Sequence, residues 1–285
     1  MRIMMCTDLE GVAGVSNFRD FCSPGDIYYE QAKRLLTEEV NAAVDGFFAG
    51  GADEITVVDG HGPGAINIEL LDERAEYERG NRKPYCPWGL DEGYDATATI
   101  GQHAKSGTPY SHITHTGSFA CYDLTINGFS IGEYGTFVLC GMELGIPSIF
   151  ASGEEAFCRE AEILTPGVVT AAVKRGLLPD DHRRGLTAKE YSMMKLSAHH
   201  MNPKAACKLI RERAEQAVRA YFENPAQFTF REFKPPYTVI REFRASPEDG
   251  LKTITRQVVK DKPTIIEALN CHWDAPLVEF SDFTE

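Results

Sequence analysis

DEITVVDGHG, residues 53–62, is the stretch of this sequence that decides the fold. It has an apolar, β-branched centre and a glycine-rich end, as expected for a buried strand followed by a turn. The preceding segment, 27–49, spaces its apolar residues with a helical period and ends at Gly50-Gly51. RIMMCTD, residues 2–8, fits another buried strand. This strand–helix–strand order predicts a parallel sheet with a right-handed crossover.

The same alternation continues to about residue 176. The sequence predicts further strands at 95–101, 145–151 and 168–176, and helices starting near Gly132 and at residue 154. Ser152 and Glu155 fit a capping box that would open the second helix. Asn127-Gly128 predicts a tight turn within the loop-rich region 107–131. Together these features predict a three-layer α/β/α sandwich with a mainly parallel sheet.

Beyond residue 177 the pattern changes. Residues 178–203 are polar and interrupted by Pro and Gly, and Asn202-Pro203 then fits the start of a helix. Two strand-like runs, 237–243 and 253–259, precede a last helix near 263–271. We therefore expect an α/β metal-binding catalytic domain at 1–177 and a smaller C-terminal α+β unit at 178–285.

Composition narrows the class of protein. The formal net charge is −13, which argues against nucleic acid as a partner because phosphate binding needs a basic surface. No run of about 18 apolar residues would span a membrane, and the first residues lack a signal-peptide pattern. We expect a cytoplasmic protein. The eight cysteines lack CxxC pairs and are interpreted as buried free thiols.

Polar residues that could bind metal follow three of the predicted strands. Asp8 and Glu10 lie two apart, so the strand period would project both carboxylates to one side. Adjacent carboxylates repel each other, and their coexistence needs protons or a cation. His61 and His103 follow the next two strands. Because the carboxyl ends of parallel strands meet at one crevice, these four side chains are expected to converge.

Glu133, between Gly132 and Gly135, adds a third carboxylate to this set. Three carboxylates and two imidazoles suit one or two divalent metals, with zinc, iron, nickel, manganese and magnesium all open. Residue by residue, ordinary roles stay open too: turn or cap residues, polar histidines, and a helix-dipole charge at Glu133. The chain contains no G-x-S-x-G elbow and no P-loop. The residues alone thus indicate an unspecified metal site.

Seven segments, in order, resemble the zinc-dependent D-aminopeptidase family. They are TDLEGVAGV (7–15), VVDGHG (57–62), GQHAKSGTP (101–109), ITHTGS (113–118), INGFSIGEYG (126–135), GIPSIFASGEEA (145–156) and VVTAAVKRG (168–176). The resemblance is faint beyond residue 176, so it says little about the C-terminal unit.

The resemblance implies five ligands for two divalent ions, expected to be zinc: Asp8, Glu10, His61, His103 and Glu133. It also implies that His115 is the catalytic histidine. His112, three residues earlier, is a second candidate, and Thr116 favours His115. For Asp59 we consider two roles, orienting His61 or capping the turn.

The activity that the resemblance implies is removal of the N-terminal residue of short peptides, including D-residues, by metal-activated water. It further implies a ring-shaped homo-oligomer, possibly a decamer. Two alternatives stay open. One is another binuclear metallohydrolase, an amidase or phosphatase acting on a small metabolite. The other is a non-enzymatic protein that binds peptides through its metal.

Overall fold

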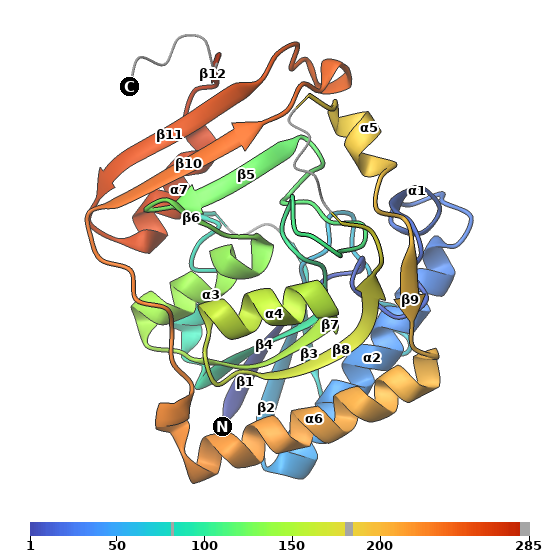
Figure 1. The fold of residues 1–285 in the computed structure, drawn as a ribbon. Helices are drawn as coiled ribbons and strands as arrows, with labels where there is room; N and C mark the ends of the chain where they lie inside the picture. Colours follow the sequence, from blue (N-terminus) through green and yellow to red (C-terminus); the bar gives the residue numbers. More distant parts are fainter. Residues whose placement is uncertain (81–82, 180–184, 280–285) are drawn as a thin grey trace.

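The computed structural model describes residues 1–80, 83–179 and 185–279 (Figure 1). Its larger sheet has seven strands in the order β3-β2-β1-β4-β7-β8-β9. These strands are β1 (Arg2–Thr7), β2 (Glu54–Asp59), β3 (Glu76–Glu78), β4 (Ala96–Gln102), β7 (Ser148–Glu154), β8 (Val169–Gly176) and β9 (Ala198–His200). All neighbours pair in parallel except β8 and β9. The predicted parallel sheet is therefore confirmed.

Helices cover both faces of this sheet, as the sandwich prediction requires. Figure 1 shows α2 and α6 on one face and α3 and α4 on the other. The helices are α1 (Phe18–Phe21), α2 (Tyr29–Gly50), α3 (Glu133–Leu144), α4 (Glu155–Leu164), α5 (Ala188–Ser192), α6 (Pro203–Glu223) and α7 (Ile265–Asp274). Short 3₁₀ turns lie at Leu90–Glu92, Pro225–Gln227 and Pro247–Asp249. The Asn202 side chain caps α6 by accepting from the Lys204 amide, as the sequence predicts.

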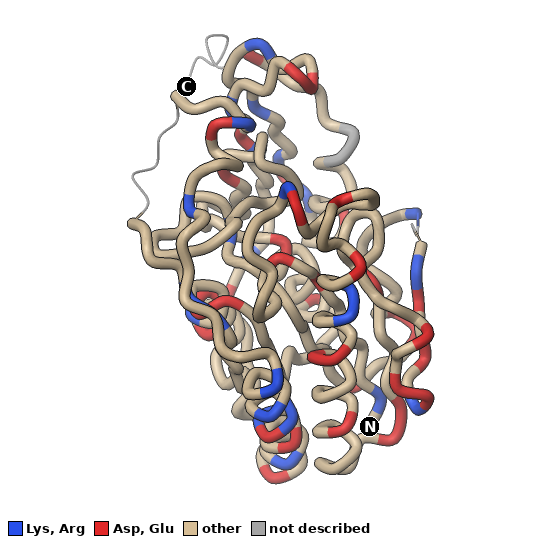
Figure 2. Tube along the Cα trace, turned by 90° about the vertical axis from the view of Figure 1, so that its right-hand side faces the viewer, with Lys and Arg blue, Asp and Glu red and all other residues tan. Residues whose placement is uncertain are grey.

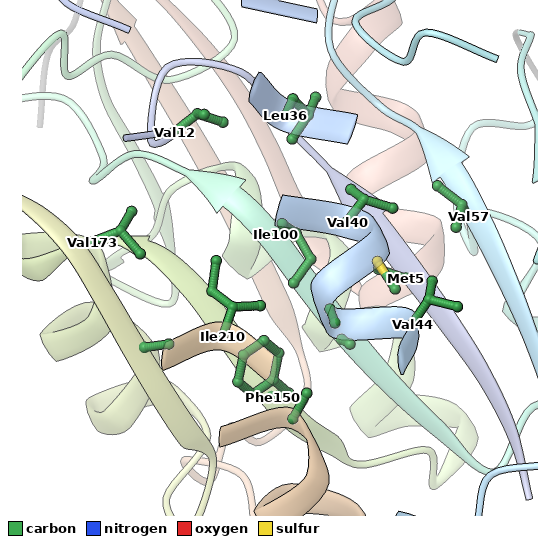
Figure 3. Packing of buried hydrophobic residues seen from close by; sticks show 14 of the residues in the cluster. Met5, Val12, Leu36, Val40, Val44, Val57, Ile100, Phe150, Val173 and Ile210 are labelled. Carbon is green, nitrogen blue, oxygen red and sulfur yellow. The ribbon is translucent and has the colours of Figure 1, made fainter. Parts of the chain in front are cut away.

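The main core lies between the seven-stranded sheet and the helices α2 and α6 (Figure 3). Strand side chains from β1, β2 and β4 meet a stripe of apolar residues on α2 at spacings of three and four. Each fully buried Leu, Val or Ile contributes about 1.5–3 kcal/mol to folding. Fully buried members include Met5, Val57, Ile100, Leu36, Val40, Val44 and Ile210. This packing fixes the strand ends that carry the candidate site.

The second sheet is antiparallel and has the order β12-β11-β10-β5-β6. Its strands are β5 (Cys121–Ile126), β6 (Phe129–Ser130), β10 (Tyr237–Phe243), β11 (Thr255–Lys262) and β12 (Val278–Glu279). Asn127 and Gly128 form the predicted tight turn between β5 and β6, both with positive φ, 49° and 77°. In Figure 1 this sheet lies above the sandwich, with α7 behind it.

Both sheets draw strands from either side of residue 177. The middle strand β5 pairs with the C-terminal strand β10, while β9 pairs with β8 and α6 packs on α2. The division into 1–177 and 178–285 stays a prediction. Each of the two segments contributes strands to both sheets.

One local prediction is wrong. Ser152 does not cap a helix, because it lies inside β7 and pairs with Ala171 of β8. The α4 helix begins at Glu155, and its N-cap residue Glu154 makes no side-chain cap hydrogen bond. Strand pairing with β8 carries the extended backbone three residues past the expected end at residue 151, so the capping motif is absorbed into the sheet.

The cysteine and charge predictions can also be compared with the structure. Each of the eight cysteines is free, and Cys6, Cys207 and Cys271 are only partly buried. Acidic and basic residues are interspersed along the chain, most visibly on α6 (Figure 2). Among the described residues, no helix is both long enough and apolar enough to cross a membrane.

Candidate metal centre

The five predicted ligands converge at the carboxyl edge of the parallel sheet. Asp8 follows β1, His61 lies in the turn after β2, His103 directly follows β4, and Glu133 is the first residue of α3. Glu10 lies in the turn after β1, where its side chain is almost fully buried. Strand order explains this meeting, because β2, β1 and β4 are adjacent in the sheet.

Their ligand atoms are spaced as donors around a common ion would be. His61 Nε2 lies 3.4 Å from Glu10 Oε1. His103 Nε2 lies 3.2 Å from Asp8 Oδ2 and 3.5 Å from Glu133 Oε1. Donors about 2.0–2.2 Å from one tetrahedral ion are about 3.3–3.6 Å apart. These three donor pairs therefore have the spacing expected around a divalent metal ion.

The hydrogen bonds of His103 support the same interpretation. His103 Nδ1 is 2.8 Å from the Ala104 carbonyl, which only accepts, so Nδ1 carries the proton of the neutral ring. Its Nε2 lone pair then faces the Asp8 and Glu133 carboxylates. Lone pair and carboxylates would repel each other without a cation between them. A carbonyl holding the far nitrogen is also the usual arrangement around a metal-bound histidine.

The electrostatics of the cluster call for positive charge. Burial, together with the nearby Glu10 charge, raises the pKa of Asp8 well above its ordinary value. Burial alone would lower the pKa of His103, but Glu133 and Asp8 raise it well above its ordinary value. Glu10 Oε2 is buried and has no hydrogen-bond partner among the described residues. A divalent ion would satisfy these groups with all three carboxylates ionised.

Two residues that sequence reasoning missed hold this edge in place. Gln102 Nε2 donates to Asp8 Oδ2 at 2.7 Å, which fixes the carboxylate. Lys174, buried on β8, donates to the carbonyl of Glu10 and to that of Val15 at 3.1 Å. Burial lowers the pKa of Lys174 to about 8. In the sequence, the position of Lys174 inside the apolar run VVTAAVKRG was the feature that could have indicated this buried contact with the Glu10 turn.

His115 lies directly over the candidate ligands. Its ring stacks on His103 with centroids 4.0 Å apart, and its Nε2 is 3.8 Å from Glu133 Oε1 and 3.9 Å from Glu10 Oε1. The Nδ1 atom is 3.0 Å from the Ile113 carbonyl, so the neutral ring presents a free lone pair on Nε2. Burial and the neighbouring His103 lower the pKa of His115, which favours this neutral form.

The rival residue His112 is placed differently. Its Nε2 lies 3.1 Å from the Ser16 carbonyl, and its ring packs edge-on against His200 at 5.4 Å. Burial lowers the pKa of His112 to about 2, so it stays neutral. Glu10 and Glu133 each lie within 4 Å of His115 Nε2, whereas His112 Nε2 faces the Ser16 carbonyl.

Asp59 and Cys22 also lie near the candidate ligands. Asp59 accepts from the Ala65 amide at 2.9 Å and from Tyr77, so it caps the turn after β2. Cys22, expected only as a buried thiol, places its sulfur within 4.8 Å of ligand atoms of Glu10 and His61. Scattered cysteine spacing gave no signal for that position.

Cavities open on two sides of the cluster. The larger has a volume of 780 Å³ and is lined by His115, Phe18, Phe119, Met193, Lys189 and Glu248, among others. The smaller has a volume of 220 Å³ and is lined by Asp8, Glu133, Gln102, Trp88, Arg241 and His272, among others. Gly117 lines both cavities.

Known proteins include relatives of this chain. A D-aminopeptidase of Bacillus subtilis (strain 168) is 30% identical over 177 residues, which cover 61% of this chain and 64% of that relative. The match thus spans less than two thirds of the relative's length. Among solved structures, the Zn-dependent D-aminopeptidase DppA from Bacillus subtilis, a self-compartmentalizing protease, aligns with a TM-score of 0.76 at 23% identity.

That alignment covers 96% of this chain and 97% of the solved one, and it shows that the two share a fold. The family model for peptidase M55, D-aminopeptidase, matches residues 1–260 and so extends well past the segments recognised in the sequence. The chain belongs to the peptidase M55 family of D-aminopeptidases.

Proposed function

We propose that this protein is a metal-dependent aminopeptidase that removes the N-terminal residue of short peptides, including peptides of D-amino acids. Family membership supports this activity. The observation that carries it is the position of the His115 imidazole, whose Nε2 lies within 4 Å of both Glu10 and Glu133. A proton acceptor beside a metal-binding cluster is the arrangement needed to hydrolyse an amide with water.

We assign the metal ligands as Asp8, Glu10, His61, His103 and Glu133. Glu10 and His61 offer donor atoms at one end of the cluster, and His103 and Glu133 offer donor atoms at the other end, beside Asp8. These two groups support two ions. Zinc is favoured by the imidazole and carboxylate donors and by the zinc dependence of the solved relative.

When bound, divalent ions supply Lewis acidity that polarises the scissile carbonyl and makes water a nucleophile near neutral pH. The protein's own groups transfer the proton and orient the ligands. His115 Nε2 takes the proton of the attacking water and returns it to the leaving amine. The Ile113 carbonyl holds the ring in the tautomer that allows this. Gln102 keeps the Asp8 carboxylate oriented.

Assembly into a homo-oligomeric ring, possibly a decamer, belongs to the same proposal. Support comes from the solved relative, which is a self-compartmentalizing protease. Light scattering on the purified protein would measure the subunit number. A cytoplasmic location stays a prediction from the sequence.

A substrate panel tests the activity. Zinc-loaded protein is offered D- and L-aminoacyl amides, dipeptides and phosphoesters, with His115→Ala as the matched inactive control. Release of the N-terminal residue from peptides by the wild type alone supports the proposal. Hydrolysis restricted to phosphoesters, or peptide binding without cleavage, would instead favour one of the two alternative classes.

A further inference from the structure

An arginine occupies the buried face of a strand in the second sheet. On β10, alternate residues Val239, Arg241 and Phe243 point to the same side, and all three are buried. Arg241 is only 9% exposed. A guanidinium so placed is costly unless it serves anionic or polar partners. The strand therefore carries a cation where its pattern calls for an apolar residue.

The Arg241 side chain borders the same cavity as two of the candidate metal ligands. It lines the 220 Å³ cavity together with Asp8 and Glu133. A β-carbon built on Gly117 would be 3.0 Å from Arg241 Nη2, and the Gly117 amide donates to Glu133 Oε1 at 2.6 Å. A side chain at 117 would crowd the guanidinium end of Arg241. One side of the guanidinium thus packs at the edge of the candidate active site.

The rest of the cavity wall is neutral or apolar. Leu124, opposite Arg241 in the strand pair, and Trp88 contribute apolar surface. Burial and the nearby Arg241 lower the pKa of His272 to about 4, so this imidazole is uncharged at neutral pH. Apart from Asp8 and Glu133, Arg241 is the charged residue among those that line this cavity.

The size of the cavity limits what it could hold. Its 220 Å³ is below the usual range of about 300–1,000 Å³ for pockets that hold drug-sized ligands. It suits one amino-acid residue rather than a length of peptide. The longer part of a substrate would have to lie in the 780 Å³ cavity on the His115 side.

We infer that the small cavity receives a carboxylate of the substrate and that Arg241 is the residue that selects for it. This inference rests on the proposed peptidase function. A guanidinium binds a carboxylate through two parallel hydrogen bonds, which a neutral amide cannot reproduce. The carboxylate comes either from an acidic N-terminal side chain or from the free C-terminus of a dipeptide.

Paired substrates separate these two sources. Glu-Ala-amide against Gln-Ala-amide isolates the side-chain carboxylate, and Ala-Ala against Ala-Ala-amide isolates the terminal one, each in D and L forms. One pair should show a preference for the carboxylate of about 10- to 100-fold in kcat/KM. Arg241→Met should reduce that preference to near unity, and Arg241→Lys should leave an intermediate value.

Binding gives a readout that does not depend on turnover. Calorimetric titration of the zinc-loaded protein with glutamate and with glutamine compares two amino acids that differ in the side-chain carboxylate. If the side chain is the source, wild type should bind glutamate about 10-fold or more tightly than glutamine, and Arg241→Met should bind both alike. Lys260→Met removes an exposed charge from the neighbouring strand β11 and should change neither ratio.

Three results would overturn the inference. They are equal rates within both substrate pairs, a preference that survives in Arg241→Met, and a uniform fall for every substrate accompanied by loss of zinc. If Arg241→Met does not fold, Arg241→Lys decides, because its preference must fall while its rate on the amides is kept. Failure to cleave any peptide would overturn the proposed function instead. Titrations with glutamate against glutamine and with Ala-Ala against Ala-Ala-amide, one pair for each carboxylate source, would then decide the inference.

Discussion

His112 and His115 are three residues apart in one loop, yet their surroundings differ completely. His115 turns an unshared Nε2 lone pair toward Glu10 and Glu133, whereas His112 uses its Nε2 on the Ser16 carbonyl. The sequence favoured His115 only through the neighbouring Thr116, because the direction of each ring depends on backbone turns at positions such as Ile113, with φ of 55°. The geometry supports His115 as the proton acceptor.

The first prediction concerns this pair. His115→Ala should lower kcat by about 10²- to 10⁴-fold because the proton acceptor is lost. Its metal content should be unchanged, as measured by elemental analysis. His112→Ala should keep turnover close to wild type while losing stability through its buried contacts. Full activity in His115→Ala would show that another group transfers the proton.

The second prediction concerns the pH dependence of stability. Glu39 is buried, accepts from the Ala13 amide at 2.9 Å, and has its pKa raised to about 8 by burial. The folded state thus holds this proton more tightly than the unfolded state does. Its contribution is fully present below about pH 4.5 and is lost as pH rises toward 8.

Glu39→Gln keeps the acceptor for Ala13 but removes the titration. Between pH 5 and 7, the unfolding free energy of wild type should fall relative to this variant by about 1.4 kcal/mol per pH unit. Urea unfolding at several pH values measures the difference. Glu38→Gln, on the half-exposed neighbour, controls for charge removal alone. Parallel stability curves for wild type and Glu39→Gln would contradict the assigned protonation.

At the level of elements, local patterns predicted the strands and helices that flank the site. Apolar runs and glycine-rich turns marked β1, β2 and β4, and parallel-sheet geometry then brought their ends together. The sequence did not predict the residues from distant segments that contact or border the site. Gln102, Lys174 and Arg241 act through contacts set by strand order and pairing, and no local pattern encodes which strand lies opposite β5.

The third prediction tests how the end of β4 supports the ligands. Gly101 has φ of +74°, and a β-carbon there would lie 2.1 Å from the Asp8 carbonyl. Gly101→Ala should cost about 1–2 kcal/mol for the backbone alone and about 1–3 kcal/mol more for the clash. Zinc affinity should fall as well, because the clash is with the backbone of Asp8, one of the assigned ligands.

Gly145→Ala is the matched control for this substitution. Gly145 has the same φ of +74°, but a β-carbon there would meet nothing within 4 Å. This variant should lose only the backbone cost and keep its zinc affinity. Thermal unfolding and competitive zinc titration measure both quantities. Equal losses in the two variants would mean that the contact with Asp8 is unimportant.

At the level of the whole molecule, the fourth prediction concerns metal removal. Chelation should abolish activity and lower the melting temperature, because Asp8, Glu10 and Glu133 then share a buried site without a cation. At a metal concentration 100 times the dissociation constant, binding stabilises by about 2.7 kcal/mol, or about 5–10 °C for a chain of this size. Added zinc should restore both. Unchanged melting with all metal removed would contradict the proposed site.

The pairing of β5 with β10 has a consequence for synthesis on the ribosome. Residues 121–126 emerge more than a hundred residues before their partner at 237–243. During that interval the β5 edge is open to pairing with other chains, a known route to aggregation. The small cavity cannot close until Arg241 and the rest of β10 have emerged. A nascent chain therefore stays without a finished candidate site until β10 has emerged.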